Sequence, residues 1–174
     1  WEANMELIDL IPEFNLYEEY WKIYTKCETL PPQYVAQGSF VEKSIIGEGS
    51  EIYGKVYNSV IGCDVVIGEN TVVRDSIIMN ETKIGSGCQI EKAIIAENDE
   101  IGNNVRLGEG NEVPNETDPS IYSNGIVTVG ERTCIPDNVS VGKNSVVYGK
   151  MKPEDFPDGR LDSGKTLIKA GERR

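Results

Sequence analysis

The sequence contains no histidine, few aromatic residues and no long apolar run. Without histidine, the chain lacks the side chain that most often serves as a general base near neutral pH. No stretch approaches the roughly 20 apolar residues that a membrane-spanning helix needs, and the first residues show no secretory signal. We therefore expect a cytoplasmic protein. Because the chain opens on Trp1 with no Met before it, we also expect it to be a piece of a longer protein.

Cysteine pairs and an excess of positive charge are also missing. The four cysteines are spread along the chain, and none belongs to a C-x-x-C pair: Cys27, Cys63, Cys88 and Cys134. This spacing argues against a disulfide framework and against a zinc site, so we expect no metal and free thiols. The net charge is −12, which repels phosphate backbones and anionic lipid surfaces. Nucleic acid and membrane are therefore not expected as partners.

The sequence does contain an internal repeat of 17 residues. The segments SVIGCDVVIGENTVVRD from Ser59, SIIMNETKIGSGCQIEK from Ser76 and AIIAENDEIGNNVRLGE from Ala93 align without gaps. Large aliphatic residues occupy three equivalent columns in them, which are Ile61, Ile78 and Ile95, then Ile67, Ile84 and Ile101, then Val73, Ile90 and Leu107. Neither a helix nor an alternating strand has this period. A coil with three short flat sides, each pointing one aliphatic residue into a triangular core, explains it.

The repeat predicts an all-β fold, a parallel β-helix that covers residues 35–149. An excursion loop without columns is expected at 109–125, and the tail 150–174 could cap the open end of the coil. The left hand does not follow from the spacing. It is implied by the resemblance to hexapeptide-repeat proteins, whereas other parallel crossovers are almost always right-handed. Glycines that follow the columns, Gly62, Gly68, Gly85 and Gly102, are expected at corners with unusual backbone angles. Asp99 breaks the pattern of small residues inside the coil, and nothing in the sequence accounts for it.

One outer face of the coil is apolar in every repeat. Alternation turns four residues outward in line, and we call them the apolar ridge: Ile45, Val60, Ile77 and Ile94. Such a patch is rarely left bare, so it is expected to be an interface. The candidates to cover it are the N-terminal segment, an absent domain or a second subunit. Residues 2–10 favour a helix, and 16–25 favour part strand, so a short helical or extended segment should precede the coils.

No motif for catalysis stands out. The segment Gly159–Thr166 fits the P-loop pattern G-x-x-x-x-G-K-[ST], but it lacks the buried strand before it and the helix after it that hold phosphates. We therefore expect a charged surface hairpin there. The carboxylates are spread over corners without an obvious acid and base pair, so no catalytic residue is assigned.

The strings WEANMELI, FNLYEEYWKIYT, PPQYV, NSVIG, RDSIIM and SNGIVTVGERTCIPDN resemble the C-terminal half of glucose-1-phosphate adenylyltransferases, over Trp1 to Val147. This resemblance implies an intact enzyme that makes ADP-glucose and pyrophosphate from ATP and glucose 1-phosphate, with Mg²⁺, for glycogen or starch synthesis. Residues 1–34 would be the end of its catalytic domain and a linker. The chain itself would be inactive and without a cofactor. It would serve as an allosteric and oligomerisation domain that contacts its own catalytic domain and other subunits.

The resemblance also bears on regulation. Lysines that hold a phosphorylated activator in plant members align with Glu97 and Ser123, and a carboxylate cannot take that role. We therefore expect that effector site to be missing. Candidate anion contacts are Arg74, Lys83, Lys92 and Arg106, unless they are only solvated surface charge. Two alternatives stay open, which are the same domain from a non-catalytic regulatory paralogue and a hexapeptide-repeat acyltransferase. The absence of histidine opposes the second.

Overall fold

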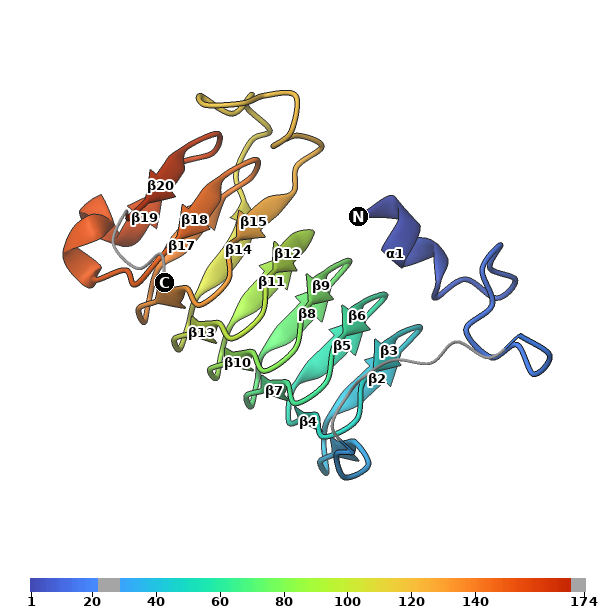
Figure 1. Cartoon of the computed structure of the whole chain (residues 1–174). Helices are drawn as coiled ribbons and strands as arrows, with labels where there is room; N and C mark the ends of the chain where they lie inside the picture. Colours follow the sequence, from blue (N-terminus) through green and yellow to red (C-terminus); the bar gives the residue numbers. More distant parts are fainter. Residues whose placement is uncertain (22–28, 170–174) are drawn as a thin grey trace.

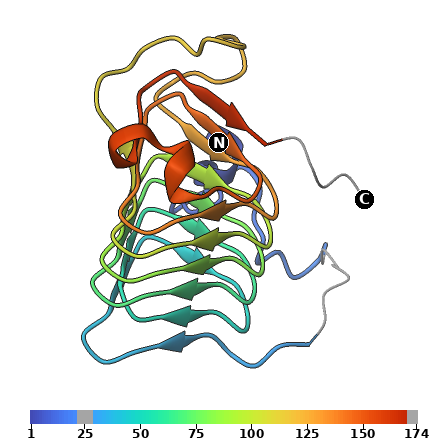
Figure 2. The ribbon, with the colours of Figure 1, turned by 90° about the vertical axis from the view of Figure 1, so that its left-hand side faces the viewer.

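The structure is a computed structural model that describes residues 1–21 and 29–169 (Figure 1). Three parallel sheets wind around one axis as a β-helix, and Figure 2 shows its coils stacked on one another. Each strand between the two ends of its sheet pairs in parallel with the strand one coil earlier and one coil later. The fold class predicted from the repeat is therefore confirmed.

Each sheet takes one strand from each coil, and we call the three sheets A, B and C. Sheet A contains β1 (Tyr34–Val35), β4 (Glu51–Ile52), β7 (Val66–Ile67), β10 (Lys83–Ile84), β13 (Glu100–Ile101) and β16 (Cys134–Ile135). Sheet B contains β2 (Phe40–Glu42), β5 (Lys55–Tyr57), β8 (Val72–Arg74), β11 (Gln89–Glu91), β14 (Arg106–Glu109), β17 (Ser140–Gly142) and β19 (Arg160–Leu161). Sheet C contains β3 (Ile45–Ile46), β6 (Val60–Ile61), β9 (Ile77–Ile78), β12 (Ala93–Ile95), β15 (Val127–Val129), β18 (Val146–Tyr148) and β20 (Thr166–Ile168).

The three aliphatic columns line the inside of the coil. In sheet A, Ile84 stands in register with Ile67 on one side and with Ile101 on the other. All nine column residues are buried, and the most exposed of them, Ile101, keeps 4% of its surface. Burying one such side chain stabilises a fold by roughly 1.5–3 kcal/mol, so the stacked columns supply much of the driving force for this coil.

The corner glycines are needed for a different reason from the one that the sequence suggests. Gly62, Gly68, Gly85 and Gly102 are absent from the residues with positive φ, and Asn and Asp residues such as Asp64 and Asn70 take that conformation instead. A Cβ on Gly68 would lie 2.6 Å from the backbone carbon of Gly85 in the next coil. The expectation of unusual backbone angles at these four glycines is wrong, because close stacking of coils is what excludes a side chain.

The excursion loop leaves the coil between β14, which ends at Glu109, and β15, which begins at Val127. The coil resumes in register after it, since Glu100 pairs with Cys134 and Ile101 with Ile135. Buried Asn115 holds the loop down, because its amide donates to the carbonyl of Asn144 at 2.8 Å. The loop, which rises above the coils in Figure 2, is therefore attached to the coils that follow it.

The parallel coils continue beyond Gly149, where the repeat pattern ends. Two short 3₁₀ turns, Pro153–Asp155 and Pro157–Gly159, lead into β19 and β20. These two strands pair with β17 and β18, in different sheets. The surface hairpin expected at Gly159–Thr166 is therefore wrong, because this segment turns a corner of the last coil. Its Lys165 donates to Glu116 of the excursion loop at 2.7 Å.

The N-terminal segment contains one short helix, α1 (Glu2–Glu6), inside the 2–10 stretch that favours a helix. The strand expected within 16–25 does not form in its described part, 16–21, which consists of turns and bends. The remaining residues of that expectation lie outside the described residues.

Candidate functional site

The apolar ridge lies on the outside of sheet C, one residue on each of β3, β6, β9 and β12. Ile77 keeps only 5% of its surface, and Ile45, Val60 and Ile94 are partly buried. Outward-pointing Val66 and Val72 on the other two sheets are also partly buried, so it is the burial of Ile77 that indicates a cover over the ridge.

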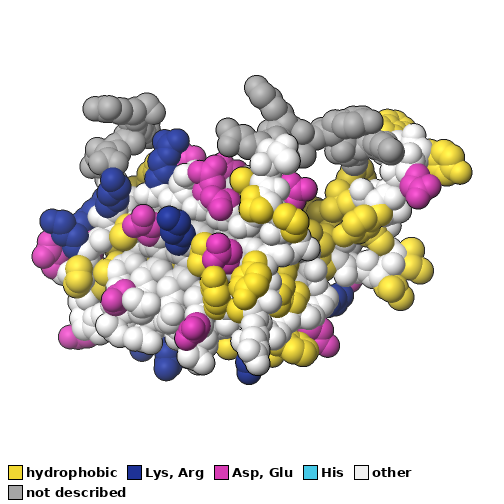
Figure 3. Space-filling view, turned by 90° about the horizontal axis from the view of Figure 1, so that it is seen from below, with side chains coloured by type: hydrophobic (Ala, Val, Ile, Leu, Met, Phe, Trp, Pro, Cys, Tyr) yellow, Lys and Arg dark blue, Asp and Glu magenta, His cyan; other side chains and the backbone are white. Residues whose placement is uncertain are grey.

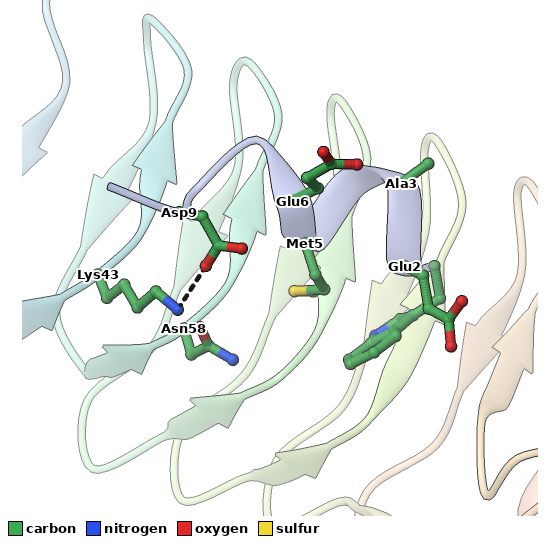
Figure 4. Close-up of a pocket in the computed structure, with 8 residues that line it drawn as sticks. Glu2, Ala3, Met5, Glu6, Asp9, Lys43 and Asn58 are labelled. Carbon is green, nitrogen blue, oxygen red and sulfur yellow. Dashed lines mark ion pairs between the residues drawn. The ribbon is translucent and has the colours of Figure 1, made fainter. Parts of the chain in front are cut away.

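The N-terminal segment supplies this cover. Trp1 donates its indole N–H to the carbonyl of Asp75 at 2.8 Å, and Asp9 pairs with Lys43 at 2.9 Å. Both partners lie two residues before a ridge residue. Figure 4 shows Met5 pointing from α1 toward the strands, and Met5 keeps 8% of its surface. The segment therefore runs back along the ridge, from the coil of β9 toward that of β3.

The chain beyond α1 leaves an apolar surface uncovered. We call residues 10–21 the aromatic segment. Several of its large side chains are almost fully exposed, namely Leu10 at 97%, Ile11 at 88%, Tyr17 at 78%, Tyr20 at 99% and Trp21 at 82%. Figure 3 shows hydrophobic side chains gathered at the end of the molecule where Figure 1 draws this segment. Exposed apolar patches of this kind mark surfaces that contact another protein or domain.

The four cations predicted to contact anions lie on different sides of the coil. Lys83 is on the outer face of sheet A. Arg74 and Arg106 are both in sheet B, but β11 lies between their strands. Lys92 stands at the corner before β12, with its ammonium 5.4 Å from the Trp1 ring. The structure therefore does not gather them into one site, and their anion contacts stay a prediction.

Besides Lys92, two of these cations have partners within the chain. The Arg74 guanidinium lies 4.2 Å from the centroid of the Tyr57 ring, and Arg106 pairs with Glu109 at 3.0 Å.

The structure also describes the two positions at which the sequence predicts that an activator site is missing. Exposed Glu97 accepts a hydrogen bond from Asn80 at 3.3 Å, and Ser123 lies in the excursion loop.

A hollow on sheet B was not singled out from the sequence. It lies over the register shift in β14, and its charged lining residues are Glu91, Glu109, Lys143 and Arg160. Two carboxylates and two cations face it, and Arg160 also pairs with Asp162 at 2.9 Å. Since the charges balance, the hollow has no clear preference for an anion. No sequence signal links these residues, because the bulge and the last coil bring them together.

The described residues hold no group of three or more Cys, Asp or Glu side chains that could bind a metal ion. Among the same residues Cys63, Cys88 and Cys134 are free thiols, and Cys27 lies outside them. No helix in the described ranges 1–21 and 29–169 has the length and hydropathy to cross a bilayer.

Comparison with known proteins gives this surface a context. A family model described as the LbH domain of the eIF2B epsilon subunit matches residues 27–117. A glucose-1-phosphate adenylyltransferase of Lachnospira eligens is 59% identical over 99% of this chain and 41% of its own length. A second, from Acetivibrio thermocellus, is 44% identical over 99% of this chain and 40% of its own length. The chain thus spans about two fifths of the relatives that it matches.

Among solved structures, the acetyltransferase domain of PglB from Neisseria gonorrhoeae is 19% identical, with a TM-score of 0.47 over 76% of this chain and 55% of that one. The family model covers more than half of the chain, and the adenylyltransferases match almost all of it. The chain therefore belongs to the left-handed β-helix domain family that this model describes, and it matches the C-terminal part of glucose-1-phosphate adenylyltransferases.

Proposed function

We propose that this chain is the non-catalytic structural and regulatory domain of a glucose-1-phosphate adenylyltransferase. The intact protein would join ATP and glucose 1-phosphate to give ADP-glucose and pyrophosphate, with Mg²⁺ in its catalytic domain. The observation that carries the proposal is the 59% identity with an adenylyltransferase of which this chain spans only 41%.

The surfaces of the chain support a scaffold role. The aromatic segment precedes the coil and exposes Leu10, Ile11, Tyr20 and Trp21 almost completely. A catalytic domain that covered these side chains would be held against the coil, since buried aromatic residues dominate the energy of such contacts. The rigid columns would then fix the orientation of the catalytic domain relative to other subunits of a homo- or hetero-oligomer.

An assay of the whole protein and of this chain tests the proposal. We expect the whole protein to form ADP-glucose from ATP and glucose 1-phosphate with Mg²⁺, and the chain alone to form none. ADP-glucose formed by the chain alone would overturn its non-catalytic role. A whole protein that is inactive by itself but changes the activity of a partner adenylyltransferase would point to the regulatory paralogue.

The regulatory part needs a separate experiment. A form of the whole protein that ends before Phe40 should lose its oligomeric state in analytical ultracentrifugation, and its ADP-glucose formation should lose any response to small-molecule effectors that the whole protein shows. An unchanged oligomer and an unchanged response would show that the coil serves neither purpose.

A further inference from the structure

Asp99 is fully buried inside the coil, at a position where the other coils carry small residues. It belongs to an interior stack that precedes the strands of sheet A, which consists of Ser50, Val65, Thr82, Asp99 and Thr133, all buried. One carboxylate oxygen, Oδ1, accepts the backbone N–H of Thr133 at 2.7 Å. The second, Oδ2, is buried without a hydrogen-bond partner. A buried polar atom without a partner is costly, so this oxygen requires an explanation.

The hydroxyl residues of the stack indicate what that explanation is. Thr82 accepts the N–H of Asp99 at 3.4 Å and donates its hydroxyl hydrogen to the carbonyl of Ala96 at 2.8 Å. Ser50 likewise accepts the N–H of Val65 at 3.1 Å and donates to the carbonyl of Gly62 at 2.8 Å. Each hydroxyl therefore accepts one bond from the next coil and donates another to the carbonyl of a corner residue.

Like Thr82 and Ser50, Asp99 accepts a hydrogen bond from a backbone N–H of the next coil. The register places Ala93 beside Val127 and Ile95 beside Val129, so the corner carbonyl equivalent to that of Ala96 belongs to Gly130. An ionised carboxylate has no hydrogen to donate to a carbonyl, whereas a protonated carboxylic acid has one. We propose that Asp99 is protonated in the folded protein under mildly acidic conditions in which an exposed aspartate is already ionised, and that its second oxygen donates to the Gly130 carbonyl.

The surroundings of Asp99 favour the neutral form. Burial raises the pKa of Asp99 to about 7, although the backbone amides of Thr133 and Ala96 lower it in part. The carboxylate of Glu131 at the next corner adds to the rise. On the flanking strands β10 and β13, Lys83 and Glu100 are exposed and on the outer face. Among the described residues no Lys or Arg side chain is buried, so no cation inside the coil compensates a negative charge on Asp99.

The position of Asp99 makes the contact between two coils sensitive to pH. Its bond to Thr133 connects β13 with β16, which are consecutive in sheet A but separated in the chain by the excursion loop. Ionisation of Asp99 would place a charge between the coils on either side of this loop and would remove the donated hydrogen bond. The contact between the coils on the two sides of the loop should therefore weaken when Asp99 loses its proton.

The sign of the pH effect follows from linkage. Because the pKa is higher in the folded protein than the ordinary value of 3.8, the folded chain keeps a proton that the unfolded chain has lost. The stabilisation that protonated Asp99 contributes is therefore fully present below about pH 4. It falls as the pH rises and is lost above about pH 7. One proton changes the unfolding equilibrium constant about tenfold per pH unit within that window.

The test compares the chain with its Asp99→Asn variant by urea unfolding from pH 5 to 8. Asparagine keeps the shape, accepts from Thr133 and donates to Gly130 at every pH. The ratio of the two unfolding constants should change about tenfold per pH unit up to about pH 6.5, with the variant the more stable form at pH 8. The matched control is Glu100→Gln, an exposed neighbour, which should leave the pH dependence unchanged.

A second measurement keeps the proposal testable if Asp99→Asn does not fold. The infrared carbonyl band of a protonated carboxylic acid should be present in the folded chain at pH 6, weaken toward pH 8 and be absent from Asp99→Thr, which restores a hydroxyl to the stack. A ratio of unfolding constants that stays flat with pH, or no such band at pH 6, would show that Asp99 is ionised.

Discussion

At the scale of single residues, the contact between coils decides which side chains a corner accepts. Gly68→Ala would place a Cβ 2.6 Å from the backbone of Gly85, and a backbone atom cannot move aside as a flexible side chain can. We expect this substitution to cost about 1–3 kcal/mol of stability, as overpacking does in well-packed interiors. Urea unfolding of the purified chain measures it.

The control for Gly68→Ala lies two residues away. Exposed Asn70 has a φ of 59°, a conformation that glycine adopts without strain. Asn70→Gly should therefore change stability by less than about 0.5 kcal/mol. If the two substitutions cost the same, close stacking would not be the reason for glycine at the corner.

The repeat predicts which residues lie inside the coil, but it does not predict the roles of Gly68 and Asp99. Spacing alone identifies Ile67, Ile84 and Ile101 as core, because a side chain must point inward once in each side of the coil. Spacing says nothing about how near the neighbouring coil comes, so it does not reveal why position 68 requires glycine. Asp99 stood out as an exception, but its role depends on a hydrogen-bond pattern that only the stacked coils show.

At the scale of elements, the excursion loop is the part that the sequence describes least. Its composition marks it as irregular, and in the structure it lies between Glu109 and Val127. The residue that attaches it, Asn115, is not distinguishable in the sequence from the other asparagines of the loop. The buried position of Asn115 arises because the last coil, whose strands carry no clear repeat, closes over it through Thr166.

Asn115→Ala tests this attachment. The substitution removes the donor to the buried carbonyl of Asn144 and the acceptor for the N–H groups of Thr117 and Asp118. Leaving a buried polar group unpaired costs about 1–3 kcal/mol, so cleavage within 110–126 by a protease should become about five to a hundred times faster. Exposed Asn111, changed to alanine, should leave the rate as it is. Equal rates for both variants would mean that Asn115 does not hold the loop.

At the scale of the whole molecule, the two surfaces at the N-terminal side of the coil differ in how far the chain itself covers them. The apolar ridge was predicted to need a cover, and α1 with its neighbours provides it within the chain. The aromatic segment has no such cover among the described residues. Sequence reasoning could find the ridge, because its residues recur with the repeat. It could not show that the segment after α1 turns its large side chains outward, because that segment has no period.

A double substitution, made both in this chain alone and in the whole protein, tests what the aromatic segment contacts. Tyr20→Ser with Trp21→Ser removes side chains that are 99% and 82% exposed in this chain, so the stability of the chain alone should change by less than about 0.5 kcal/mol. If the proposed catalytic domain or a second subunit covers this segment, the same pair in the whole protein should lower the midpoint of thermal unfolding by several degrees and weaken the proposed oligomer, because buried aromatic contacts would be lost. Glu18→Ser with Glu19→Ser, in the same segment, is the matched control and should be neutral in both contexts. If the aromatic pair is also neutral in the whole protein, the catalytic domain and the other subunits do not cover this segment, and the scaffold role would have to rest on another face of the coil.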